Sequence, residues 1–242
     1  FKNNKQNHKM AISVEKKGAE NNDNALNKKE AALIKNRKAL IYGVLAIIII
    51  IAGYLAYKTY YAEPREDEAS TAIAKGQDYF ANQQFDKAFN GDGAGFKGFK
   101  AITSDYSGTK AGNLANLYAG LCCANLDKWK EAASYLENYS SADDMMISPA
   151  AVAALGDAYA HLNQLDKAVE SFKKAAKMAD DEAEDNTNNS LSPTFLIKAG
   201  EILESQNKKD EALQIYQDIK KKYVNSAAYQ QIDKYIERAT TK

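Results

Sequence analysis

The longest apolar stretch of the chain runs from Ala39 to Tyr57, nineteen residues that include no charged side chain. At about 1.5 Å of rise per residue, a helix of this length crosses the roughly 30 Å hydrocarbon core of a bilayer. Isoleucines fill its centre, and Tyr42 and Tyr54 stand toward its ends, an arrangement typical of membrane-interface aromatic belts. The pattern predicts a single transmembrane helix over residues 39–57.

Two other interpretations of this stretch are less favourable. A buried core helix of a soluble domain does not usually remain apolar over so many consecutive residues beside a charged tail. A cleaved signal peptide has a shorter apolar region that is followed by small residues at the cleavage site, and no such site follows Tyr57.

After the span, apolar positions recur with helical spacing, and the spacing itself repeats. In the clearest unit, residues 148–180, Tyr159 follows Gly156 by three residues, Ala168 follows it by twelve and Phe172 by sixteen. Small residues at Gly156 and Ala168 let two antiparallel helices approach closely, while the aromatic rings fill the space between them. This is the sequence pattern of a tetratricopeptide repeat.

Three further units carry parts of the same pattern. Their shared positions are a glycine and, twelve residues later, an alanine: Gly76 and Ala88, Gly120 and Ala132, Gly200 and Ala212. Successive glycines are 44, 36 and 44 residues apart, compared with about 34 for this repeat class. The excess falls in NGDGAGFKGF after Phe89 and in DDEAEDNTNN before Pro193, which we predict to be loops, the second acidic and solvated.

The ends of the predicted helices carry recognisable signals. Ser148 and Ser192 each precede a proline, which predicts serine N-caps with proline at the first helical position. Near the C-terminus, one helical face of a terminal capping helix is predicted to carry Tyr229, Ile232, Tyr235 and Ile236. The predicted fold is therefore all-α: an N-terminal single transmembrane helix, a tetratricopeptide repeat solenoid of three to four helical hairpins, and a C-terminal capping helix.

Charge is distributed unevenly, although the formal net charge is zero. Residues 1–38 contain ten Lys and Arg against four Asp and Glu, whereas residues 39–242 contain 22 against 28. The excess of Lys and Arg before the span places the N-terminus in the cytoplasm by the positive-inside rule. We therefore expect a disordered basic cytoplasmic tail at 1–38, the transmembrane helix at 39–57, and a repeat domain at 58–242 on the other side of the membrane.

Beyond its tail, the chain resembles the YfgM family, periplasmic tetratricopeptide accessory subunits of the SecYEG translocon. The resemblance rests on YAEPREDEA after the span, the NGDG insertion, and SDYSGTKAGNLANLYAGLC entering the second unit, which look like the Bacteroidetes-type version. It implies a single-pass protein of the bacterial inner membrane with a periplasmic C-terminal domain. The implied partners are the SecYEG translocon, secreted or unfolded polypeptide clients, and periplasmic chaperones.

Two alternatives stay open at this point. One is a structural scaffold of another cell-envelope assembly that has no secretory clients. The other is an organelle import receptor with a cytosolic repeat domain, which the charge distribution around residues 39–57 and the resemblance both disfavour.

The first helices of such repeats line a concave groove, where partners bind. The predicted groove positions are Ile73, Phe80, Leu117, Leu121, Asp157, Ile197 and Glu201. They make the groove apolar at one end and acidic at the other, which suits a helix or extended segment of apolar and basic character. Alternatively, the apolar positions pack against a neighbouring helix of the same chain.

The residues give no pattern of catalysis or cofactor binding. Cys122 and Cys123 are adjacent, which suits small buried side chains better than a disulfide or metal site, and His8 and His161 are far apart. The glycine-rich segment lacks P-loop spacing, and Lys220–Lys222 has no stacking aromatics beside it. We predict a protein that is not an enzyme, with no metal, no cofactor and no bound nucleic acid.

Overall fold

The computed structural model of the protein describes residues 36–241. The chain divides into two compact units, Phe1–Ala62 and Glu63–Lys242, which we describe one at a time. All regular elements in residues 36–241 are helical. Most of the predicted tail over residues 1–38 lies outside the described residues.

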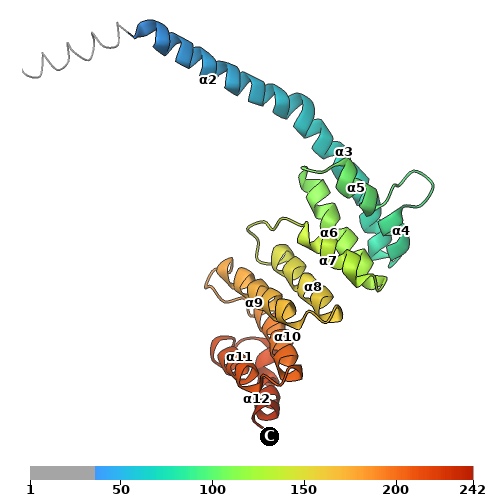
Figure 1. The fold of residues 1–242 in the computed structure, drawn as a ribbon, viewed down its shortest axis with the longest axis vertical. Helices are drawn as coiled ribbons and strands as arrows, with labels where there is room; N and C mark the ends of the chain where they lie inside the picture. The colour runs from blue at the N-terminus through green and yellow to red at the C-terminus, as the bar shows by residue number, and fades with distance from the viewer. Residues whose placement is uncertain (1–35, 242) are drawn as a thin grey trace, which may run out of the picture. The chain divides into compact units, whose positions relative to one another are not determined.

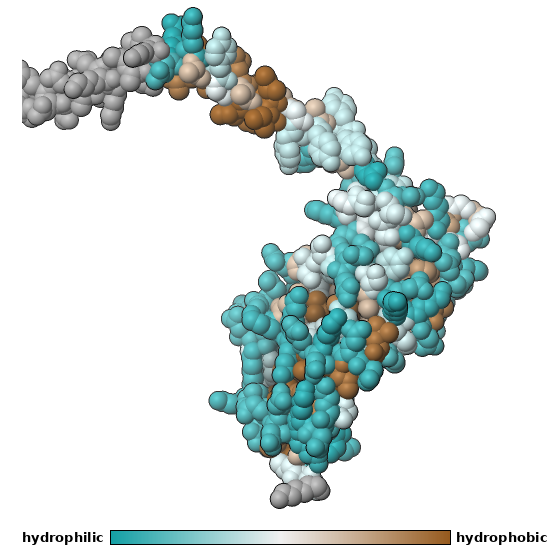
Figure 2. All heavy atoms as spheres, in the orientation of Figure 1, coloured by the Kyte–Doolittle hydropathy of each residue, from teal (hydrophilic) through white to brown (hydrophobic). Residues whose placement is uncertain are grey.

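In the first unit, helix α2 runs over Arg37–Tyr57 and is followed by a π-helical turn, η1, over Lys58–Ala62. No residue of α2 is buried, and the central isoleucines Ile49 and Ile50 are 69% and 70% exposed. Figure 2 shows this apolar surface in brown. Within residues 36–241, one helical segment has the length and composition to cross a membrane, and α2 forms its apolar part. Because exposed aliphatic surface is favourable in lipid and unfavourable in water, this supports the predicted span.

The second unit contains, within the described residues, four helical hairpins (Figure 1). Their helices are α3 (Glu63–Ala81) and α4 (Phe85–Asn90), α6 (Lys110–Asn125) and α7 (Trp129–Glu137), α8 (Ile147–His161) and α9 (Leu165–Asp181), and α10 (Ser192–Ser205) and α11 (Lys209–Lys222). An additional helix, α5 (Phe99–Asp105), lies between the first two hairpins. A 3-10 turn, η2 (Ala227–Gln230), and α12 (Ile232–Thr240) follow the last. The predicted all-α fold is confirmed.

The same turn joins the two helices of every hairpin. Its residues with left-handed backbone are Gln83, Asp127, Asn163 and Asn207, with φ between 56° and 61°. In each turn the next residue donates its backbone N–H to a carbonyl five positions back, as Gln164 does to Tyr159 at 2.8 Å. This is the Schellman motif, which satisfies the last carbonyls of the first helix. The repeat therefore extends to the backbone hydrogen bonds of its turns.

Glycines at the shared position allow the two helices of a hairpin to pack closely. A Cβ added at Gly120 would lie 2.6 Å from Leu136, and one added at Gly200 would lie 2.4 Å from Tyr216. The corresponding distance from Gly156 to the ring of Phe172 is 3.2 Å. The partner alanines Ala88, Ala132, Ala168 and Ala212 have no exposed surface. Because the alanine follows the glycine by twelve residues, these two small residues lie where the two helices of each hairpin come closest together.

The first hairpin departs from the pattern, because the residue sixteen positions after Gly76 is Asp92. Here the inserted segment supplies the missing rings: a Cβ on Gly76 would lie 2.5 Å from Phe99 and 2.8 Å from Phe96. The Asp92 carboxylate holds this segment by accepting hydrogen bonds from the backbone N–H groups of Ala94 and Phe96 at 2.8 and 2.9 Å. The insertion is thus part of the hydrophobic core as well as a loop.

Lys75 and Tyr79 of α3 complete the Asp92 site, with Nζ and the phenol oxygen at 2.6 and 2.8 Å from Oδ2. The ammonium group of Lys75 and the two backbone donors hold the pKa of Asp92 well below its usual range. The insertion is therefore fastened to α3 by a carboxylate that is ionised at neutral pH.

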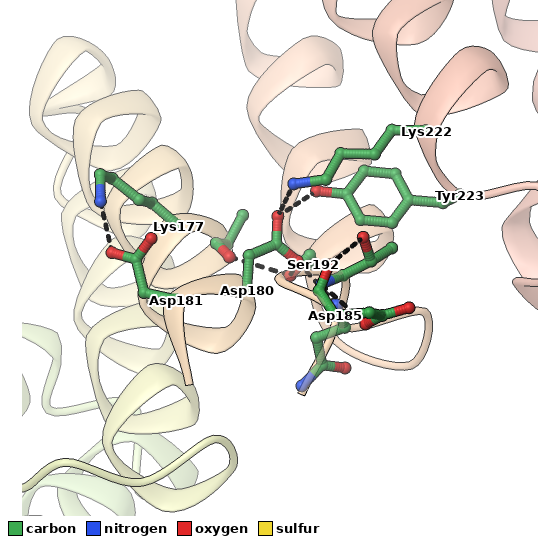
Figure 3. A network of polar contacts seen from close by, with 10 residues as sticks. Lys177, Asp180, Asp181, Asp185, Ser192, Lys222 and Tyr223 are labelled. Atoms are coloured by element: carbon green, nitrogen blue, oxygen red, sulfur yellow. Dashed lines mark hydrogen bonds and ion pairs between the residues drawn. The ribbon is translucent and has the colours of Figure 1, made fainter. Parts of the chain in front are cut away.

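The second insertion, DDEAEDNTNN before Pro193, is also anchored by a carboxylate. The prediction of a solvated acidic loop is therefore only partly right. Asp180, 7% exposed, lies at the end of α9 (Figure 3). Its carboxylate accepts hydrogen bonds from Ser192 and Asn188 at 2.7 and 2.8 Å, and from Lys222 and Tyr223 at 2.6 Å each. Burial by itself would raise the pKa of Asp180, but these donors outweigh it and lower the pKa. The network joins α9, α10 and the end of α11.

The predicted serine N-caps are wrong. Ser148 and Ser192 lie inside the first turns of α8 and α10 and are fully buried. Asp144 receives backbone N–H groups at the start of α8, including that of Ile147 at 2.5 Å, and Asn188 receives that of Leu191 at 2.9 Å before α10. Side chains from the preceding loops cap these helices, which leaves the serine hydroxyls free to bond within the fold.

Buried apolar side chains form two clusters in the repeat domain. The first draws on α3 to α8, and the second on α8 to α12. The capping helix α12 belongs to the second, because Ile232 has no exposed surface and Ala239 is 6% exposed. Tyr229, expected on the same face, instead lies in η2 and is 40% exposed. Helix α12 thus covers the end of the solenoid largely as predicted.

Candidate functional site

The seven predicted groove residues divide by burial. Ile73 and Leu117 are 5% and 7% exposed and belong to the first hydrophobic cluster. These two side chains therefore pack against neighbouring helices, the alternative raised for the apolar positions, and they offer little surface to a partner. Phe80, Leu121, Asp157 and Ile197 are half-buried, and Glu201 is exposed.

Aromatic rings surround the apolar end of the predicted groove. Phe80 makes edge-to-face contacts with Phe85 and Tyr118, with ring centroids 5.4 and 5.2 Å apart. Gln77 donates a hydrogen bond to the hydroxyl of Tyr118 at 3.2 Å. Because this bond and the edge-to-face contacts fix the rings, the partly exposed surface of Phe80 is a rigid apolar feature.

An ion pair connects the third and fourth hairpins. Lys198 on α10 donates from Nζ to both carboxylate oxygens of Asp157 on α8, at 2.7 and 2.8 Å. Ile197 is the residue before this lysine. Lys198 was missing from the sequence prediction, because its partner lies 41 residues away and no local pattern connects the two.

The predicted acidic end of the groove is also paired. Arg238 on the capping helix lies 2.7 Å from Glu204 and 3.7 Å from Glu201. The carboxylates of Asp157, Glu201 and Glu204 thus have cationic partners within the chain, so the predicted acidic end of the groove also carries positive charge. Arg238 in the capping helix was the one sequence feature that pointed to this pairing. Its contact with α10 could not be predicted, because that contact depends on tertiary packing.

The side chains with potential chemistry have structural surroundings. Cys122 and Cys123 are free thiols with no exposed surface, and burial raises the pKa of each to about 12. The imidazole of His161 stacks on Trp129, with ring centroids 3.6 Å apart. In residues 36–241, no group of three His, Cys, Asp or Glu side chains is arranged to hold a metal ion.

Comparison with known proteins identifies the repeats. Two family models described as "Tetratricopeptide repeat" match residues 150–182 and 195–226, which are the hairpins of α8 with α9 and α10 with α11. The crystal structure of a variant of a Podosopora anserina protein, described as a kinesin light chain with nearly identical TPR-like repeats, is similar in fold. It has a TM-score of 0.55 and 12% sequence identity, over 72% of this chain and 85% of that one. No curated protein matches the chain in sequence. The protein thus contains tetratricopeptide repeats, a scaffold for binding other proteins.

Proposed function

We propose that this protein is a membrane-anchored, protein-binding adaptor of the bacterial inner membrane. The observation that carries the proposal is an exposed apolar helix, α2, on the same chain as a solenoid of interaction repeats. The Lys and Arg excess in residues 1–38 supports a cytoplasmic N-terminus and a periplasmic domain at 58–242.

Within this proposal the protein is an accessory subunit of the Sec translocon. It contacts secreted polypeptides as they emerge and recruits periplasmic chaperones to them. Support comes from the resemblance to the YfgM family, carried by segments such as YAEPREDEA and NGDG. A structural scaffold of another envelope assembly is the second candidate, favoured by the same anchor and repeats.

The groove of the first helices is the proposed binding surface. Phe80 and Leu121 provide its accessible apolar contacts, while Ile73 and Leu117 are buried in the hydrophobic cluster against which both pack. Asp157, Ile197 and Glu201 continue the surface along α8 and α10, where the paired charges favour a partner with polar or uncharged groups. An apolar helix or extended segment fits this distribution.

A pull-down of the full-length protein in mild detergent, followed by mass spectrometry, tests the proposal. Recovery of SecYEG and periplasmic chaperones supports the translocon role, whereas recovery of a different envelope complex supports the scaffold. The Leu121→Asp variant places a carboxylate on the groove and should lose its clients. Ser134→Asp places the same charge on an exposed position of α7 and should keep them. If both variants retained every client, the groove would not be the binding surface.

A further inference from the structure

A cleft of about 700 Å³ lies across the first half of α6, outside the predicted groove. Its walls are the end of α5 with the loop before α6, and the connection after α7. Neither Leu117 nor Leu121 lines it. Its volume is within the range of protein ligand sites, and it is open to solvent.

Amide and hydroxyl side chains line much of the cleft, beside apolar groups such as Leu114 and Ala142. Its side chains include three asparagines, Asn113, Asn116 and Asn138, together with Ser107 and Ser141. Among the described residues, Lys110 is the one formally charged side chain that lines it. A site with many uncharged donors and acceptors suits the polypeptide main chain, which is itself uncharged and rich in N–H and C=O groups.

Asn113 already binds main chain in this cleft. Its amide nitrogen donates to the carbonyl oxygen of Ser140 at 2.8 Å, and its amide oxygen accepts from the N–H of the same residue at 2.7 Å. This pair of bonds contacts the main chain of one residue and leaves its side chain unread. The connection after α7 is thus held in the way that an asparagine would hold a bound peptide.

Asn116 and Asn138 have hydrogen-bonding groups that remain available for a bound main chain. Asn116 lies one turn after Asn113 on α6, where side chains three residues apart are neighbours. Within residues 36–241 its side chain makes one long bond, 3.4 Å to the carbonyl of Gly112, and its amide oxygen accepts none. The exposed Asn138 carboxamide makes no hydrogen bond with any residue in the described part of the chain. Asn116 on α6 and Asn138 at the end of α7 therefore present unused donors and acceptors to the same cleft.

From this geometry we infer that the cleft binds an extended, unfolded polypeptide segment through its main chain, without regard to its sequence. Asn116 and Asn138 are the residues that hold the segment, by the same paired bonds that Asn113 makes to Ser140. The inference rests on the proposed role in binding unfolded clients and gives that role a second site, which offers amide groups for main-chain hydrogen bonds.

Binding of a fluorescently labelled, uncharged, end-blocked peptide to the full-length protein in detergent tests the inference. The Asn116→Leu/Asn138→Leu double variant should bind it about tenfold more weakly, since two main-chain contacts are lost. A scrambled peptide should bind as the original does, and an analogue N-methylated at alternate residues should bind far more weakly, because it lacks half of the main-chain donors. The variant must melt at the wild-type temperature, which is expected because Asn113 is unchanged.

A photocrosslinking amino acid in place of Ser107 should label the peptide, and one in place of Lys174 on the exposed face of α9 should not. Equal labelling from the two positions, equal binding of the N-methylated peptide, or wild-type binding by the double variant would each overturn the inference. After any of these results, the proposed function would still be supported if the Leu121→Asp variant lost its unfolded clients. If the wild-type protein binds no unfolded chain of any kind, the inference fails together with the client-binding role.

Discussion

Two glycine-to-alanine substitutions at the same position of neighbouring repeats should differ sharply in cost. Replacing a helix-interior glycine by alanine gains about 1 kcal/mol in helix propensity. At Gly156 the added methyl would lie 3.2 Å from three atoms of the Phe172 ring, a contact that small shifts relieve. At Gly200 it would lie 2.4 Å from Cε1 and 2.6 Å from Cζ of Tyr216.

The difference arises because Tyr216 cannot move aside. Its side chain has no exposed surface, and its ring is packed against Tyr235 of the capping helix at 5.3 Å. Overpacking of such a site costs about 1–3 kcal/mol. After the gain in propensity, Gly200→Ala should lower the free energy of unfolding by up to about 2 kcal/mol, while Gly156→Ala should change it by less than about 0.5 kcal/mol.

Urea unfolding of the full-length protein in detergent, followed by far-ultraviolet circular dichroism, measures both changes. Adding Tyr216→Leu to Gly200→Ala should cost less than the sum of the two single changes, since removal of the ring relieves the clash. The reasoning about close helix approach would be refuted if Gly156→Ala were the more destabilising substitution, or if the effects of Gly200→Ala and Tyr216→Leu were additive.

Three further outcomes follow from buried or stacked groups. The pKa of Asp180 is lower in the fold than the ordinary value of 3.8, so its ionised form stabilises the protein at higher pH and that contribution is lost as pH falls through the folded value. Asp180→Asn should therefore lose about 1–3 kcal/mol at neutral pH and show a shallower loss of stability on acidification below pH 4. Cys122 and Cys123, whose pKa is raised to about 12, should react with thiol reagents only when the protein unfolds. His161→Ala should change the emission of Trp129, the sole tryptophan, and reduce stability by less than about 1 kcal/mol.

Each of these outcomes has a direct control. An Asp181→Asn variant changes an exposed neighbour of Asp180 and should retain the wild-type pH dependence of unfolding. Rapid thiol labelling of the native protein, compared with labelling in denaturant, would contradict the burial of the cysteines. Unchanged tryptophan emission in His161→Ala would contradict the stacked geometry.

The hairpins were predictable because their constraint is local and periodic. Gly156, Ala168 and Phe172 lie within seventeen consecutive residues, and helix periodicity alone determines which of them meet. The same register located Gly120 and Gly200 in their hairpins. The apolar helix α2 was equally predictable, because a membrane span is identified from the composition of a single segment.

Contacts between distant segments were not predictable in the same way. The helix-start serines at 148 and 192 resemble N-caps, yet the caps come from Asp144 and Asn188, since those loops fold back over the helix starts. Phe99 replaces the ring missing from the first hairpin only because the insertion returns to Gly76. The partners of Asp157 and Glu201 lie on other helices, and a charge pattern along one helix does not identify them.

The two hydrophobic clusters share a single element of the repeat domain, α8. Ala151 and Ala158 face the first cluster, and Ala153 faces the second. In an array whose units contact only their neighbours, such an element couples two blocks that can otherwise open independently. Backbone amides of α8 should therefore be among the slowest to exchange with solvent, because its exposure requires both blocks to separate. Any strain applied by a partner at one end of the array would reach the other end through the side chains of this one helix.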